Sequence, residues 1–393
     1  MAHSMPMDLA REGLAERASP KALAVPWYIW SGLVAVSSIA FGLYWDISWH
    51  MTIGRDTFWT PAHLLIQFGG ILAAITCSYL VFATTFGHNP RLREASVGMW
   101  GFRGPLGAFL CAWGGVTMVT SAPFDNWWHN SFGLDVQILS PPHVVLAIGI
   151  LGVEIGFMVL LVAQQNRADG ALRAKFTRLF LYMASIGLFL HLMLLAELID
   201  PNQMHAPMAY RALSLGAPMI LVAYSLASDH KWGATIIAAS AMAMRIFFLW
   251  TFPLFPATPK LGPVYTNVTH MVPLSFPVLL IFPAMAIDLV RQRLGNRNKW
   301  LLAAALGAAY VATLVAIEWP WASFMVSPLA RNRIFGMIYF PYQFPSTLHY
   351  LAYKFEPTTA AEMARGLVIA CVSAMATSRL GLAFGGWLAK IRR

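Results

Sequence analysis

The chain has 393 residues, of which 58% are hydrophobic and only 11% are charged, and its mean hydropathy is +0.60. These proportions exclude a soluble domain, because a surface that faces water needs far more charge. The formal net charge of +10 indicates basic loops beside anionic lipid headgroups, and no nucleic-acid partner is expected. The cysteines Cys77, Cys111 and Cys371 lie singly in apolar runs, which argues against a disulfide framework or a zinc knuckle.

Apolar runs long enough to cross a bilayer predict an all-α polytopic membrane protein with about ten transmembrane helices. The expected spans are 27–50, 60–85, 103–124, 142–164, 176–198, 206–228, 232–254, 268–290, 300–320 and 363–388. A polar tail at 1–25 precedes two metal-binding hairpins within 26–165, namely 26–86 and 103–165. Further helices of the same bundle follow at 175–320, then an interfacial loop at 321–362, and a last helix with a basic tail at 363–393.

The lysines and arginines alternate between loops, which predicts the orientation of the chain. Basic residues precede the first span and lie between spans two and three, four and five, and eight and nine, and they close the C-terminus. The loops between spans three and four and between five and six carry none. We therefore expect a multi-pass protein of the inner (cytoplasmic) membrane with both termini cytoplasmic. The loops after spans one and three would then face the periplasm.

Two stretches of the chain match in register, which predicts an internal repeat of helical hairpins. "WDISWHMTIGRDTFWTPAH" ends at His63 and "FDNWWHNSFGLDVQILSPPH" ends at His143, with one extra residue in the second copy. The corresponding pairs are Asp46 and Asp125, His50 and His129, Gly54 and Gly133, Asp56 and Asp135, and His63 and His143.

The spacing within each copy predicts a cluster of three polar side chains. Asp46 and His50 are four residues apart, as are Asp125 and His129, and therefore share one face of a helix. Thr60-Pro61 and Ser140-Pro141 are typical of a capped helix start, which would place His63 and His143 at the third residue of each returning helix.

Two neutral imidazoles and one carboxylate are ligands that late first-row metals accept while leaving coordination positions open. Histidine and aspartate at a membrane boundary can also serve only as helix caps or headgroup contacts, but two copies in register favour metal ligation. Asp56 and Asp135 are expected to cap the loops or to orient a ligand histidine.

The first copy resembles a stretch of the C subunit of the copper membrane monooxygenases, the particulate methane and ammonia monooxygenase family. The match covers about residues 45–65 and consists of Asp-x3-His-x12-His with the segment "RDTFWTPAHLL". The resemblance implies that Asp46, His50 and His63 are copper ligands within the membrane. Unlike a family C subunit, this chain has more spans, carries a second Asp/His/His set and lacks a cupredoxin-like segment, so iron is an alternative to copper and the site is mononuclear or dinuclear.

Other ionisable residues in apolar surroundings are candidates because buried charge is costly in lipid. His191, Glu197, Asp200 and His205 cluster at the outer end of the third hairpin. The two histidines are further candidate metal ligands. Glu197 and Asp200 are candidate catalytic carboxylates, which would coordinate a metal or transfer protons. Arg245, in the middle of a span, requires an acidic or carbonyl partner.

The favoured function is a metal-dependent oxygenase that uses dioxygen as co-substrate to oxidise a small molecule near the periplasmic face. It would require an unidentified electron donor and surrounding lipid, and it would act as a homo-oligomer or beside other membrane subunits. A metal or small-molecule permease and a non-catalytic subunit of an oxidase complex are the alternatives. A permease favours polar residues and interrupted helices at mid-membrane, whereas the predicted ligands lie toward one end.

Overall fold

The structure is a computed structural model of the whole chain, and it describes residues 24–54, 59–88, 90–133, 140–199, 204–260, 267–295, 297–339 and 358–393. Within these residues, nine helices are long and apolar enough to cross a membrane. They are α2 (Trp27–Thr52), α3 (Pro61–Phe86), α5 (Leu106–Phe132), α6 (Pro141–Gln165), α7 (Gly170–Leu194), α8 (Pro207–Ser228), α9 (Gly233–Thr251, extended by the 3-10 turn η4, Phe252–Leu254), α11 (Lys299–Met325) and α13 (Ala360–Leu388). The prediction of an all-helical, multi-pass membrane protein is therefore confirmed.

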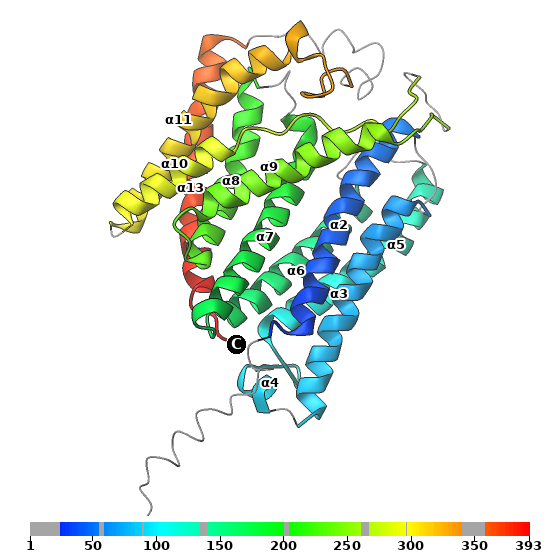
Figure 1. Cartoon of the computed structure of the whole chain (residues 1–393), viewed down its shortest axis with the longest axis vertical. Helices are drawn as coiled ribbons and strands as arrows, with labels where there is room; N and C mark the ends of the chain where they lie inside the picture. Colours follow the sequence, from blue (N-terminus) through cyan, green and yellow to red (C-terminus); the bar gives the residue numbers. More distant parts are fainter. Residues whose placement is uncertain are drawn as a thin grey trace, which may run out of the picture.

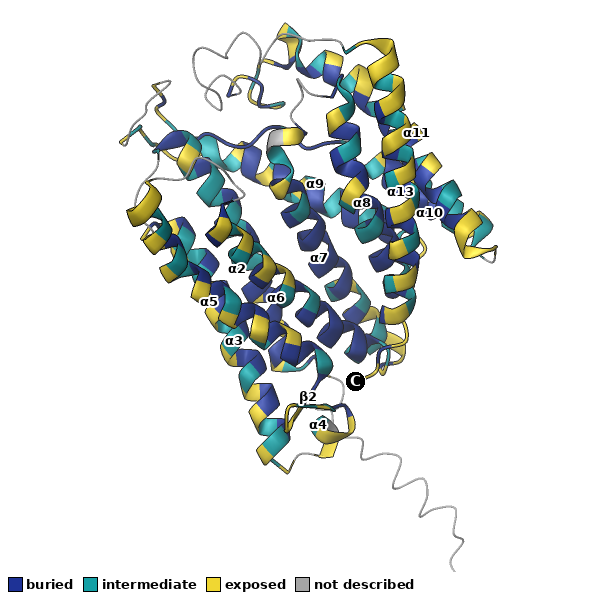
Figure 2. Ribbon diagram, turned by 180° about the vertical axis from the view of Figure 1, so that it is seen from behind, coloured by how far each residue is buried: buried dark blue, intermediate teal, exposed yellow. Residues whose placement is uncertain are grey.

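The helices form two groups joined by α7 (Figure 1). In one group α2 packs against α3, α3 against α5, and α5 against α6; in the other α13 packs against α8 and α11. Helix α7 contacts α2 and α6 of the first group, α8 of the second, and α9, which packs beside α8. It is buried along most of its length (Figure 2), so it is the central helix of the bundle.

The predicted eighth span, 268–290, is wrong as a continuous helix. Residues 271–280 have no regular secondary structure, and the short helix α10 (Ile281–Leu294) begins only after them. The prolines Pro273 and Pro277 explain the interruption, because proline lacks the N–H that a helix requires and clashes with the preceding turn.

The interrupted segment is buried, and side chains of neighbouring helices satisfy its backbone polar groups. From α2, Ser48 donates a hydrogen bond to Val272 O at 2.6 Å, while Thr52 Oγ1 accepts one from Val272 N at 2.8 Å. Tyr44 from the same helix accepts one from Leu274 N at 3.1 Å. Irregular backbone at membrane depth is tolerated where protein supplies such partners.

Two buried charged residues hold the rest of this segment. Arg245 Nε of α9 donates to Ser275 O at 3.0 Å, which confirms the prediction that Arg245 finds a carbonyl partner. Glu318 of α11 accepts a hydrogen bond from Leu279 N at 2.6 Å. The interrupted segment therefore ties α2, α9 and α11 together.

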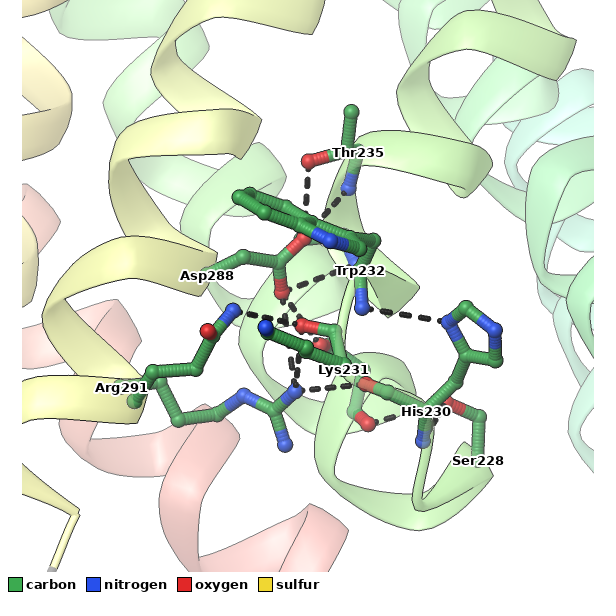
Figure 3. A network of polar contacts seen from close by, with 10 residues as sticks. Ser228, His230, Lys231, Trp232, Thr235, Asp288 and Arg291 are labelled. Carbon is green, nitrogen blue, oxygen red and sulfur yellow. Dashed lines mark hydrogen bonds and ion pairs between the residues drawn. The ribbon is translucent and has the colours of Figure 1, made fainter.

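Asp288 fastens the short helix α10 to the start of α9 (Figure 3). Its carboxylate is fully buried and accepts hydrogen bonds from Thr235 N at 2.9 Å, Thr235 Oγ1 at 2.8 Å and Ser225 Oγ at 2.9 Å. Arg291 lies 3.7 Å from this carboxylate and donates to His230 O at 2.6 Å. A carboxylate at a helix N-terminus is stabilised by the free N–H groups there, so Asp288 caps α9 from a neighbouring helix.

Several connections in the described part of the chain carry short elements of their own. Between α3 and α5 lie the short helix α4 (Pro90–Glu94) and a hairpin of β1 (Val97–Met99) and β2 (Phe102–Gly104). The 3-10 helices η2 (Ala196–Leu198) and η5 (Pro328–Ala330) follow α7 and α11. Of the predicted interfacial loop at 321–362, residues 321–325 belong to α11 and 340–357 lie outside the described residues.

Candidate metal sites

Each predicted triad is assembled at the end of a helical hairpin. Asp46 and His50 lie in the last turns of α2, and His63 is the third residue of α3. Asp125 and His129 occupy the corresponding place in α5, and His143 is the third residue of α6. We call Asp46, His50 and His63 the first triad, and Asp125, His129 and His143 the second triad.

In the first triad the carboxylate oxygen Asp46 Oδ1 lies 3.1 Å from His63 Nε2 and 3.6 Å from His50 Nε2. In the second, Asp125 Oδ1 lies 3.4 Å from His129 Nε2 and 3.5 Å from His143 Nε2. In both, one potential ligand atom from each residue falls within 4.8 Å of the others. These two triads are the groups of at least three such residues that the described part of the chain brings together.

These separations are those of ligands around a metal ion. Two atoms bound about 2.1 Å from one ion, at angles of roughly 90 to 110°, lie about 3.0 to 3.4 Å apart. The closest distances in both triads fall in or near this range.

The tautomer of His129 supports metal ligation in the second triad. Its Nδ1 lies 3.2 Å from Gly133 O, which can only accept, so Nδ1 carries the proton and donates. If the ring carries no second proton, only a lone pair remains on Nε2, and it faces Asp125 Oδ1 at 3.4 Å, an oxygen that also accepts. Two facing acceptors are stabilised by a cation between them. A backbone carbonyl on the far ring nitrogen is also what orients metal-bound histidines.

The carboxylates support the same conclusion. Asp125 Oδ1 is buried and is not in hydrogen-bonding geometry with a donor among the described residues, whereas Asp46 Oδ1 faces His63 Nε2 at 3.1 Å. A buried acceptor without a donor costs free energy. With two imidazole nitrogens and one carboxylate oxygen in each triad, the residues fit a metal ion.

The start of the second helix in each hairpin determines where its histidine lies. Thr60 Oγ1 accepts a hydrogen bond from His63 N at 3.1 Å, so the predicted cap is confirmed in the first hairpin. Ser140 also stands at the N-cap position, but its side chain makes no capping hydrogen bond and its buried Oγ has no partner among the described residues. The prediction of a hydroxyl cap is wrong for Ser140.

The two hairpins also share a packing register. A Cβ on Gly69 of α3 would meet Ala35 O and Ile39 of α2, and a Cβ on Gly149 of α6 would meet Gly114 O and Met118 of α5. Gly69 and Gly149 each lie six residues after the histidine of their helix. The packing is equivalent in the two hairpins, and the internal repeat stays a prediction.

His205 and His191 lie outside both triads. His205 Nε2 contacts Trp319 O at 3.0 Å and Ser323 Oγ at 2.9 Å, both on α11. Burial lowers the pKa of His205 below the usual value. His191 Nε2 is buried in the bundle without a hydrogen-bond partner among the described residues. Their predicted metal ligation therefore gains no support from the structure.

Several predicted residues lie where nothing is described. Asp56, Asp135 and Asp200 fall outside the described residues, and the side chain of Glu197 is likewise not described. The catalytic roles predicted for Glu197 and Asp200 stay predictions.

Sequence reasoning missed Glu154, a buried carboxylate in the middle of α6. The signal was present, because a single acid inside an apolar span is by itself a candidate functional residue.

No family model, curated protein or solved structure matches this chain. The fold and the site define a multi-pass membrane protein, in which two groups of His and Asp residues could hold metal ions.

Proposed function

We propose that the protein is a membrane-embedded, metal-dependent oxidoreductase that uses dioxygen to oxidise a small substrate at the triads. The observation that carries the proposal is the pair of triads, each with two imidazole nitrogens and one carboxylate oxygen within 4.8 Å of one another. Three ligands of this kind leave coordination positions open for other molecules. Copper is the first choice of metal, and iron is the alternative.

A bound copper or iron ion would supply one-electron redox chemistry that no amino-acid side chain provides. The residues themselves do the rest. Asp46 and Asp125 supply negative charge that offsets that of a cation. The hydrogen bond from His129 to Gly133 O keeps the Nε2 lone pair directed at the site.

The resemblance to the C subunit of the copper membrane monooxygenases supports the same function, since Asp46, His50 and His63 match its ligand pattern at the same spacing. A small apolar substrate would reach the triads through the lipid. The electron donor and any further subunits or copies of the chain are part of the proposal, as is the placement of the triads on the periplasmic side.

The two triads could act separately or as one centre. His143 of the second triad lies near enough to Asp46 for an imidazolium there to interact with that carboxylate, and α3 packs against both α2 and α5. A shared dinuclear centre, in which the metals would lie about 3.5–4 Å apart, is therefore part of the proposal.

A metal permease is the second candidate, and the interruption at 271–280 favours it, because transporters bind their cargo at interrupted helices. Several polar groups of this segment are, however, committed to Ser48, Thr52, Tyr44, Arg245 and Glu318. Groups with protein partners are not available to coordinate an ion. The interruption therefore argues more for a structural role than for transport.

Oxygen uptake distinguishes the two functions. Purified protein is loaded with Cu(I) or Fe(II) under argon, and dioxygen consumption is followed with a quinol as electron donor. We expect metal-dependent uptake by the wild type and by His88→Ala, whose exposed histidine lies outside both triads, and loss of at least about 100-fold in His50→Ala. Metal-loaded protein that consumes no dioxygen but moves the ion across vesicle membranes would establish the permease instead.

A further inference from the structure

Glu154 is a carboxyl group that the proposed metal chemistry does not use. It lies near the middle of α6 and is only 5% exposed. No lysine, arginine or histidine among the described residues lies within ion-pairing distance of it. An ionised carboxylate is expensive at such a position, so the group is most stable when it carries a proton.

The neighbouring helices are shaped around this carboxyl group. Tyr224 of α8 donates a hydrogen bond to Glu154 Oε1 at 3.4 Å. On α7 the residue opposite is Gly187, where a Cβ would overlap Oε1 itself. The absence of a side chain at Gly187 therefore makes the space that the carboxyl group occupies.

His191 lies one turn further along the same face of α7 as Gly187. Its Nε2 is buried and has no hydrogen-bond partner among the described residues. Its ring lies against Gly216 of α8, where a Cβ would overlap the imidazole. Two glycines on adjoining helices thus make room for two titratable side chains that have no opposite charge beside them.

The helical spacing brings the two groups within reach of each other. Cβ atoms four residues apart on a helix are separated by about 5–6 Å, and Glu154 Oε1 occupies the Cβ position of Gly187. His191 follows Gly187 by one turn of α7, and its ring contacts Gly216 of α8. This separation suits a proton transfer through one intervening water.

We infer that Glu154 and His191 form a proton-exchange pair in the interior of the bundle. The proton leaves the carboxylic acid oxygen and binds Nε2, which turns a neutral acid and a neutral imidazole into a carboxylate and an imidazolium. The reverse step restores the neutral pair. Only O–H and N–H bonds change, so no oxidant or reductant is required, and the neutral pair is the resting state because the surroundings are apolar.

Other titratable side chains on the helices that pack against α6 and α7 have contacts elsewhere. The partners are Gln164 for Tyr28, Leu274 N for Tyr44, Ser37 for Tyr182, Ala73 O for Cys111 and Ser275 for Arg245. Asp46 and Asp125 face the histidines of the triads. Tyr210 of α8 and Arg379 of α13 also have a buried polar atom without a partner among the described residues, but neither forms a hydrogen bond or ion pair with Glu154, whereas Gly187 places Glu154 one turn from His191.

Infrared spectroscopy of the full chain in nanodiscs tests the pair. The C=O stretch of a protonated carboxyl group is followed while H2O is replaced by D2O, with metal-free protein, so that the outcome is independent of the triads. We expect a band that is present in the wild type, absent in Glu154→Gln and kept in Glu362→Gln, a matched change at an exposed carboxylate. In His191→Gln the band stays, and its deuterium shift slows at least about 100-fold.

Two results would overturn the inference. One is a wild type without a band assignable to Glu154, which would mean an ionised carboxylate. The other is unchanged exchange in His191→Gln, which would leave Glu154 a static buried acid. If Glu154→Gln does not fold, Glu154→Asp replaces it, because the shorter side chain moves the carboxyl group away from His191 by one methylene. The C=O band should then remain, and its deuterium shift should be as slow as in His191→Gln.

Discussion

At the scale of single residues, the two hairpins differ in how they begin their returning helices. Thr60 Oγ1 caps His63 N, whereas Ser140 Oγ is buried and unpartnered among the described residues. Thr60→Ala should therefore lower the free energy of unfolding by about 1 kcal/mol, while Ser140→Ala should leave it unchanged or raise it, because the replaced hydroxyl has no partner to lose. Thermal unfolding in detergent measures both, and equal losses would contradict the difference between the caps.

His205 should make the fold sensitive to acid. Its folded-state pKa is lowered by burial, so below about pH 6.5, the usual pKa of histidine, the unfolded chain binds a proton that the folded chain does not. The contribution of neutral His205 to the free energy of unfolding is therefore fully present above that pH and is lost as the pH drops through it. His205→Gln should lose less thermal stability than the wild type between about pH 7.5 and 5.5, whereas His88→Gln should behave as the wild type. Identical acid profiles for all three proteins would show that His205 is not the sensor.

The residues of the triads could be found from sequence because local rules place them. A four-residue spacing fixes Asp46 beside His50, and a capped proline start fixes His63 within the first turn of α3. His191 and His205 were grouped with metal ligands because they are near in sequence to the same end of the bundle. Their actual neighbours are Gly216 on the following helix α8 and Trp319 on α11, and no local pattern encodes such contacts.

At the scale of elements, close helix contact sets the geometry of the first triad. A Cβ on Gly69 would fall on Ala35 O, so Gly69→Ala should push α3 away from α2 and move His63 from Asp46. We expect a loss of about 1–3 kcal/mol in stability together with weaker metal binding. Gly386→Ala is the matched control, since a Cβ there meets nothing within 4 Å. A Gly69→Ala protein as stable as the control would show that the contact is not close.

The elements themselves were largely predictable, because nine of the expected spans coincide with long apolar helices. The eighth was not, since its composition is as apolar as that of a helix. Pro273 and Pro277 carried the signal against a continuous helix. Which side chains would satisfy the freed backbone, such as Arg245 and Glu318, follows only from the packing of the whole bundle.

At the scale of the whole molecule, the distribution of basic residues predicts which end of the bundle faces outward. Single cysteines at positions 135 and 170 are introduced into a chain whose Cys77, Cys111 and Cys371 are replaced. A membrane-impermeant thiol reagent added to intact cells should label position 135 and not position 170. The reverse pattern would place the triads on the cytoplasmic side.

The metal content of the purified protein tests the central claim most directly. Full-length protein in detergent is analysed by elemental mass spectrometry beside His50→Ala, His129→Ala and the control His88→Ala. With two separate triads, we expect about two copper or iron ions per chain in the wild type and the control, and about one in each triad variant; with a shared centre, either variant loses both. Wild-type protein that binds no metal, or triad variants that bind as much as the wild type, would contradict the assignment of the triads as metal sites.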